Sequence, residues 1–224
     1  MLLKISTIVF VASITVILPI IVGSITVKKS KYNPLNTIFI YCVVYAVFEV
    51  IAWYYALNGL QNHFISNIFS YIDTAFWGIY FYQILQNTLS KRIVIVLSIA
   101  TFIIIMYSHF GTHRDFNRID SFAQSISNLS LIAMSLLFFY QLLNNLDTKD
   151  LLSYPHFWIC VGVLVYFSGV FFIDIFAEYI TFNKDKSIAQ FWNFRNYLLF
   201  FQRIFLAIGL WFSKTPLQLS PSSK

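Results

Sequence analysis

The sequence predicts an all-α integral membrane protein that consists of a single bundle of seven transmembrane helices, and three observations predict it. Of the 224 residues, 58% are hydrophobic and only 11% are charged, whereas a soluble domain averages about 25% charged residues. The mean hydropathy is +0.72. Seven apolar stretches are each long enough to cross the hydrocarbon core of a bilayer, which takes about 20 residues of helix.

The predicted helices follow one another along the chain with short breaks between them. They cover approximately residues 5–27, 36–57, 64–86, 92–110, 120–144, 155–180 and 190–212. The first apolar run, of about 22 residues, is longer than the core of a signal peptide, so we interpret it as a retained helix. Pro19 lies inside this run and is expected to kink it.

The connections leave no room for a second domain. No predicted loop exceeds about a dozen residues, far below the size of a folded module. Kinase, nucleotide-binding and DNA-binding modules are therefore excluded. We expect residues 1–214 to form one transmembrane domain and residues 215–224 to form a flexible C-terminal tail.

Lysine and arginine residues predict the orientation, because cytoplasmic loops carry an excess of them. Eight lie on one predicted side of the bundle and five on the other. The richer set is Lys28, Lys29, Lys31, Lys91, Arg92, Lys149, Lys214 and Lys224, and the poorer set is Lys4, Arg114, Arg118, Lys184 and Lys186. This bias predicts an external N-terminus and a cytoplasmic C-terminus, in a membrane of the bacterial inner type. We interpret the net charge of +6 as such orientation signals rather than as a nucleic-acid surface.

Ionisable residues inside the predicted spans are the strongest functional signal, because each costs a few kcal/mol unless it is paired or hydrated. The candidates are Glu49, Asp73, Asp174, Glu178, Arg195 and Arg203. All six map to the outer half of the membrane or near its centre. Further polar and aromatic residues follow the same helix stripes: Trp53, Trp77, Gln124, Asn128, Asn196 and Gln202. The pattern predicts an outward-facing polar cavity among helices two, three, five, six and seven, with helices one and four peripheral.

The depths of these charges along their helices predict two layers of ion pairs. Arg195 should pair with Glu178 or Asp174, and the deeper Arg203 should pair with Asp73 or Glu49. Two carboxylates would then remain without an arginine, which would suit proton handling or a cationic ligand. The alternative is that the pairs serve only to hold the helices together.

No catalytic, metal or cofactor motif accompanies this polar cluster. His109 and His113 are four residues apart, as metal ligands on one helix face would be, and His63 lies at the same predicted edge. Gly111 interrupts the pair, so we expect neither a metal nor another cofactor. The helix count resembles that of microbial rhodopsins, but no lysine precedes Lys214 in the last span, so a retinal Schiff base is excluded.

These observations favour a membrane sensor or receptor-like subunit. It would bind a small or lipid-like ligand in the polar cavity and signal through a separate partner protein. The alternative is a proton- or ion-coupled transporter or channel, and the third hypothesis is an intramembrane lipid-modifying enzyme, although no catalytic motif supports it. Membrane lipid is an expected partner and nucleic acid is not, while homo-oligomerisation is left open.

Overall fold

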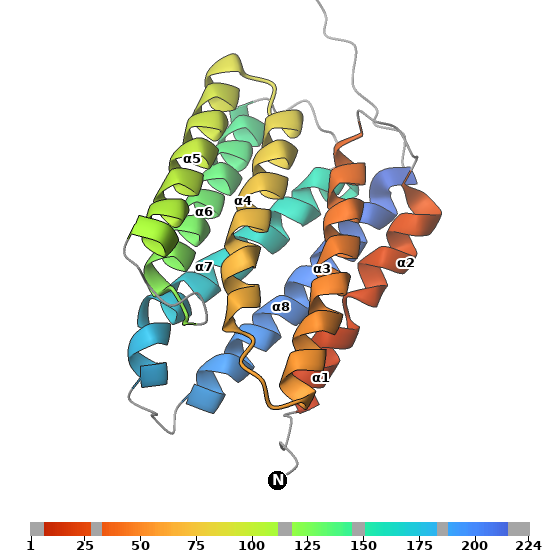
Figure 1. Ribbon diagram of the computed structural model, residues 1–224. Helices are drawn as coiled ribbons and strands as arrows, with labels where there is room; N and C mark the ends of the chain where they lie inside the picture. The colour runs from red at the N-terminus through yellow and green to blue at the C-terminus, as the bar shows by residue number, and fades with distance from the viewer. Residues whose placement is uncertain (1–6, 28–32, 112–117, 145–150, 183–187, 215–224) are drawn as a thin grey trace, which may run out of the picture.

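The protein is described by a computed structural model that covers residues 7–27, 33–111, 118–144, 151–182 and 188–214. These residues form helices and no strands, as the sequence predicted. In chain order the elements are α1 (Thr7–Ile14), α2 (Ile17–Thr26), α3 (Pro34–Leu57), α4 (His63–Ile84), α5 (Thr88–Met106), the π-helical turn η1 (Tyr107–Gly111), α6 (Ser121–Asn144), the 3-10 turn η2 (Leu151–Ser153), α7 (Pro155–Phe182), α8 (Ile188–Trp211) and the 3-10 turn η3 (Phe212–Lys214). The long helices run alternately up and down in Figure 1. The predicted tail and the Lys28–Lys31 cluster lie outside the described residues.

Five helical segments of the described chain are long and apolar enough to cross a membrane. They are Thr7–Thr26, Pro34–Leu57, Thr88–Gly111, Ser121–Asn144 and Pro155–Ala177. Large apolar side chains point outward from them, such as Val50 with 70% and Val96 with 65% of its surface exposed. Apolar side chains facing outward over whole helices suit hydrocarbon and not water. The chain is therefore a helical membrane protein. The remaining two helices, α4 and α8, are of similar length but do not reach the same hydropathy over a membrane-spanning stretch.

The helices form a ring in which α4 and α8 lie against several neighbours. Helix α7 packs on α6 and α8, α8 packs on α1 and α2, and α4 lies between α3 on one side and α5 and α6 on the other (Figure 1). Trp77, Tyr80 and Phe81 on α4 are fully buried in the core, with Phe138 of α6 and Ile159 of α7. Helix α5 contacts α4 and α6 and lies at the edge of the bundle, as predicted for the fourth span.

The first predicted span is broken into two helices, α1 and α2, four residues before Pro19. Proline cannot donate a backbone hydrogen bond, and its ring clashes with the carbonyl of the residue four positions earlier, here Thr15. The Thr15 carbonyl instead accepts the Leu18 amide at 3.1 Å. The Thr15 hydroxyl donates to the Ala12 carbonyl at 2.6 Å. The expected kink is therefore an interruption of the regular helix over the two residues between α1 and α2.

Capping residues explain where several helices start. Asn33 accepts from the Leu35 amide and precedes Pro34, which takes the first helical position. Asn87 accepts from the Leu89 amide, so α5 begins at Thr88, four residues earlier than predicted. Lys91 and Arg92 consequently lie in the first turns of α5 and not in the loop before it.

Candidate functional site

Both predicted layers of ion pairs are present in the bundle. Arg203 Nη2 of α8 lies 3.2 Å from Glu49 Oε2 of α3. Arg195 Nη1, two turns earlier on α8, lies 3.0 Å from Asp174 Oδ1 of α7. Residues eight apart lie about 80° apart around the helix axis, within the broad face that a helix turns toward its neighbours, so α8 directs both guanidinium groups into the bundle.

The deeper pair, around Arg203, uses the break in the first span. Arg203 is only 3% exposed, and its Nη1 donates to the Ala12 carbonyl of α1. Ser13 of α1 donates to Glu49 Oε1 at 2.5 Å. The guanidinium carbon also lies 4.9 Å from the centre of the Tyr45 ring, an attractive arrangement for a cation. The first span was predicted to be peripheral, and this was wrong: the break that Pro19 causes leaves a carbonyl available at membrane depth.

The second pair, around Asp174, joins α6, α7 and α8. Asp174 is 1% exposed and accepts two hydrogen bonds, from Arg195 at 3.0 Å and from Asn128 Nδ2 at 2.8 Å. Arg195 also lies 5.6 Å from the Trp192 ring. A buried carboxylate with two donors, one of them a guanidinium, has the partners that burial requires.

Asp73 of α4 does not form an ion pair with Arg203, for which it was one of the two predicted partners. Its Oδ1 accepts a hydrogen bond from the Tyr41 hydroxyl of α3 at 2.8 Å. Of the two partners predicted for Arg203, Glu49 forms the ion pair and Asp73 does not. Glu178 belongs to α7, but its side chain lies outside what the structure describes. Glu49 and Asp174 therefore each pair with an arginine, whereas Asp73 is bound to a tyrosine hydroxyl.

A polar cavity of about 30 Å³ lies between Asp73 and Asp174. It is lined by residues from four helices: Ser66, Phe69, Ser70, Asp73, Gln124, Ser127, Asn128, Tyr166, Phe167, Val170, Asp174 and Arg195. Gln124 is 5% exposed, and neither its amide nitrogen nor its amide oxygen has a partner among the described residues. A cavity of this size suits one or two water molecules or a small ion. Pockets for organic ligands are about ten times larger.

The other predicted site residues lie outside this cavity. Trp77 is fully buried against Tyr41, with ring centres 5.1 Å apart, and belongs to the core. Trp53 packs edge-on against Phe10 of α1. Asn196 donates to the carbonyl of Trp192 in its own helix. Gln202 is buried on α8, one residue before Arg203, and does not line the cavity. Three residues of this region were not predicted from the polar pattern. Ser127 and Tyr166 line the cavity, and Tyr41 donates a hydrogen bond to Asp73.

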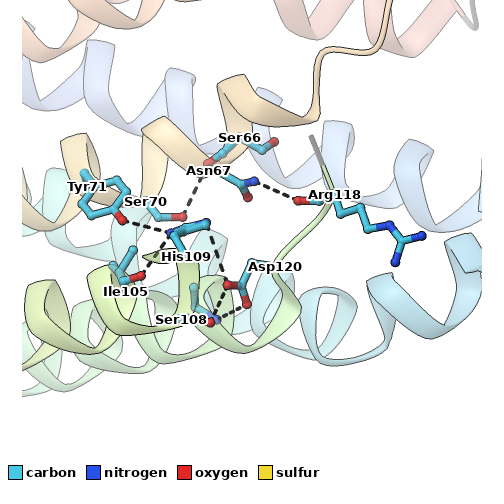
Figure 2. Close-up of polar contacts among 10 residues, drawn as sticks. Ser66, Asn67, Ser70, Tyr71, Ile105, Ser108, His109, Arg118 and Asp120 are labelled. Carbon is cyan, nitrogen blue, oxygen red and sulfur yellow. Dashed lines mark hydrogen bonds and ion pairs between the residues drawn. The ribbon is translucent and has the colours of Figure 1, made fainter. Parts of the chain in front are cut away.

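The histidines have structural contacts where they are described. Figure 2 shows His109, in the π-helical turn η1, with its Nδ1 3.0 Å from the Tyr71 hydroxyl and its Nε2 3.8 Å from Asp120 Oδ2. Ser108 also donates to Asp120, and Asp120 caps the start of α6. These contacts attach the end of α5 to α4 and α6. His113 lies outside the described residues, and within them no three potential ligands gather at a metal site.

A second, larger depression lies on the lipid-facing side, between α4 and α5. Its volume is about 700 Å³, within the range of ligand pockets. One face of each helix lines it: Thr74, Ala75, Gly78, Ile79, Tyr82 and Gln83 on α4, and Val94, Ile95, Ser98, Ile99, Phe102 and Ile103 on α5. We refer to these residues as the α4–α5 groove. The groove was not predicted, although the small side chains of Ala75 and Gly78 leave space beside α4 at this place.

Comparison with protein-family models, with curated proteins and with solved structures finds no match to this chain.

Proposed function

We propose that this chain is a receptor-like sensor subunit of a bacterial-type inner membrane, which binds a lipid-like ligand in the α4–α5 groove. Binding would be transmitted through α4 to the polar cavity and from there to a separate partner protein. In this proposal all seven long helical segments cross the membrane, with the N-terminus outside and the C-terminus inside.

One observation carries the proposal: α4 lines the groove with one face and the polar cavity with another. Thr74 lines the groove, and its hydroxyl lies 3.3 Å from that of Ser127, which lines the polar cavity. The neighbouring Asp73 lines the polar cavity. A small shift of α4 against α5 would therefore reach both sites, and helix shifts of this kind are a common form of signalling in helical bundles.

The sizes of the two sites decide where the ligand is placed. The polar cavity, at about 30 Å³, accepts water or a small ion, whereas the groove, at about 700 Å³, accepts an organic molecule. Apolar walls with few polar groups are also typical of ligand pockets. We therefore assign the lipid-like ligand to the groove, and the polar cavity to the response.

The orientation can be tested with fused reporters. A reporter that is active only in the cytoplasm should be active when it follows Lys224, and one fused at the N-terminus should be inactive. The expectation follows from the excess of lysine and arginine on one side of the bundle. The opposite result would place the Lys91 end of the groove at the external surface.

The coupling can be tested by replacing Thr74 with valine, which removes the hydroxyl and keeps a similar shape. Phosphatidylglycerol added to delipidated protein in detergent should change the infrared carboxyl band of the wild type, and Asp73→Asn should reduce that change. In Thr74→Val the change should disappear, while affinity should fall less than about threefold, since a hydrogen bond between membrane helices averages about 0.6 kcal/mol.

Two tryptophan variants of α5 test whether the lipid binds in the groove. Ile99→Trp fills the groove and should weaken lipid binding roughly tenfold or more, because overpacking costs about 1–3 kcal/mol. Val96→Trp places the same bulk on the same helix outside the groove, so binding should be unchanged. A wild-type protein that binds the lipid with no carboxyl change would contradict the sensor proposal.

A proton- or ion-coupled transporter is the second candidate, and the broken first span favours it. Interrupted helices at membrane depth form the ion sites of many transporters. Here the Ala12 carbonyl released near the break is bound by Arg203. Proton or cation flux into liposomes containing the purified protein would favour this candidate over the sensor. The lipid-modifying enzyme stays a prediction that no observation here tests.

A further inference from the structure

We infer that the α4–α5 groove binds one acyl chain of an anionic phospholipid and that Lys91 binds its headgroup. This inference rests on the proposed function and names the chemical class of its ligand. The length of the groove, the chemistry of its walls and the charge at one end all fit such a lipid.

The length of the groove matches one leaflet of a bilayer. From Thr74 to Gln83 the α4 wall rises about 14 Å, at 1.5 Å per residue. The hydrocarbon core of a bilayer is about 30 Å thick, so each leaflet contributes about half of that. The groove ends at Tyr82 and Gln83, close to the end of α4 at Ile84 and the start of α5 at Thr88. It therefore extends from the membrane surface toward the midplane, as a lipid chain does.

The walls of the groove are apolar along most of this length. Ile79, Ile95 and Ile99 are each about half exposed toward the outside of the bundle, so they are accessible to a lipid chain in the membrane. Gly78 allows the two helices to approach closely at the groove: a Cβ atom there would come within 2.4 Å of the Ser98 hydroxyl. Filling such a surface with a hydrocarbon chain gains dispersion contacts without the loss of polar interactions.

The open end of the groove carries positive charge. Lys91 Nζ lies 5.3 Å from the centre of the Tyr82 ring, and Tyr82 lines the groove. Lys91 precedes Val94 and Ile95 by one helical turn, so it lies on the groove-lining face of α5. Arg92 is exposed beside it. The stretch from residue 74 to residue 106 contains no aspartate or glutamate.

The positive charge at the open end of the groove favours anionic lipids over zwitterionic ones. A basic residue near the surface attracts an anionic headgroup, and the cytoplasmic leaflet is the leaflet that carries anionic lipids. In the proposed orientation, the Lys91 end lies on the cytoplasmic side. The N-terminus of α5, capped by Asn87, adds partial positive charge at the same end. The combination favours phosphatidylglycerol over a zwitterionic lipid with the same chains.

Native mass spectrometry of the purified protein, titrated with phosphatidylglycerol or with phosphatidylcholine of identical chains, tests the inference. Wild-type protein should bind phosphatidylglycerol at least about fivefold more tightly, the preference expected for one basic residue near the surface. Lys91→Gln should remove most of this preference and leave phosphatidylcholine binding unchanged. Arg118→Gln, which removes one exposed positive charge away from the groove, should retain the preference.

Three results would overturn the inference. Equal binding of both lipids by the wild type would mean that the groove holds a chain without headgroup selection. An unchanged affinity in Ile99→Trp would mean that the lipid binds elsewhere. A dimer that becomes monomeric in Ile99→Trp would show that a second copy of the chain occupies the groove. Each of these is a binding result, and the carboxyl response that tests the sensor proposal is measured separately. Selective binding without that response contradicts the sensor proposal alone.

Discussion

Replacing Arg203 by leucine is expected to lower the free energy of unfolding by about 3 kcal/mol, the lower end of the range for breaking a buried ion pair. The substitution leaves Glu49 with the hydrogen bond from Ser13 and removes a donor from the Ala12 carbonyl. We expect the lower end because the Glu49 side chain is 20% exposed and can be partly hydrated. Thermal unfolding in detergent, followed by circular dichroism, measures the loss.

Two double variants identify the partner of Arg203. Arg203→Leu combined with Glu49→Gln should recover more than half of the loss, because a neutral amide can remain beside leucine without an unpaired charge. Arg203→Leu combined with Asp73→Asn should recover nothing, since Asp73 is bound to Tyr41. Recovery by the Asp73 variant alone would contradict the pairing with Glu49.

The helices and the ion pairs were predictable from the sequence for simple reasons. A span needs a fixed length of apolar residues, so the bounds of α3, α6 and α7 followed from hydropathy to within a few residues. A guanidinium in hydrocarbon needs a carboxylate at similar depth, so Arg195 and Arg203 each had a short list of partners. Depth alone could not separate Asp73 from Glu49. That choice depends on the rotation of α3 and α4 about their axes.

Other features of the site have no signature in the sequence. Every residue carries a carbonyl, so the role of Ala12 becomes visible only when the chain is folded, although Pro19 indicated where the break would occur. Tyr41 is aromatic and buried, and such residues usually belong to the core. The α4–α5 groove arises from the packing of two helices, and a linear pattern shows only the small residues on one of them.

Replacing Asp174 by asparagine is expected to cost about as much stability as the loss of Arg203. Both oxygens of Asp174 accept hydrogen bonds, from Asn128 and from Arg195. An asparagine offers one acceptor and one donor, so one of the two neighbours would face another donor. Arg195 would also lose its carboxylate, and a charged group left unpaired in a membrane is costly. Together these effects should lower the free energy of unfolding by about 3 kcal/mol.

Exchanging the two side chains provides the matched control. The double variant Asp174→Asn with Asn128→Asp returns a carboxylate and an amide to adjacent positions, and it should recover at least half of the loss. Asn128→Asp alone should be destabilising, because it places two carboxylates within hydrogen-bonding distance of each other. If Asp174→Asn unfolds at the wild-type temperature, Asp174 carries a proton in the resting protein, and the charged Arg195 guanidinium donates to a neutral carboxyl group. In that case the polar cavity would lie between two carboxyl groups that can exchange a proton, and the transporter candidate would be favoured over the sensor.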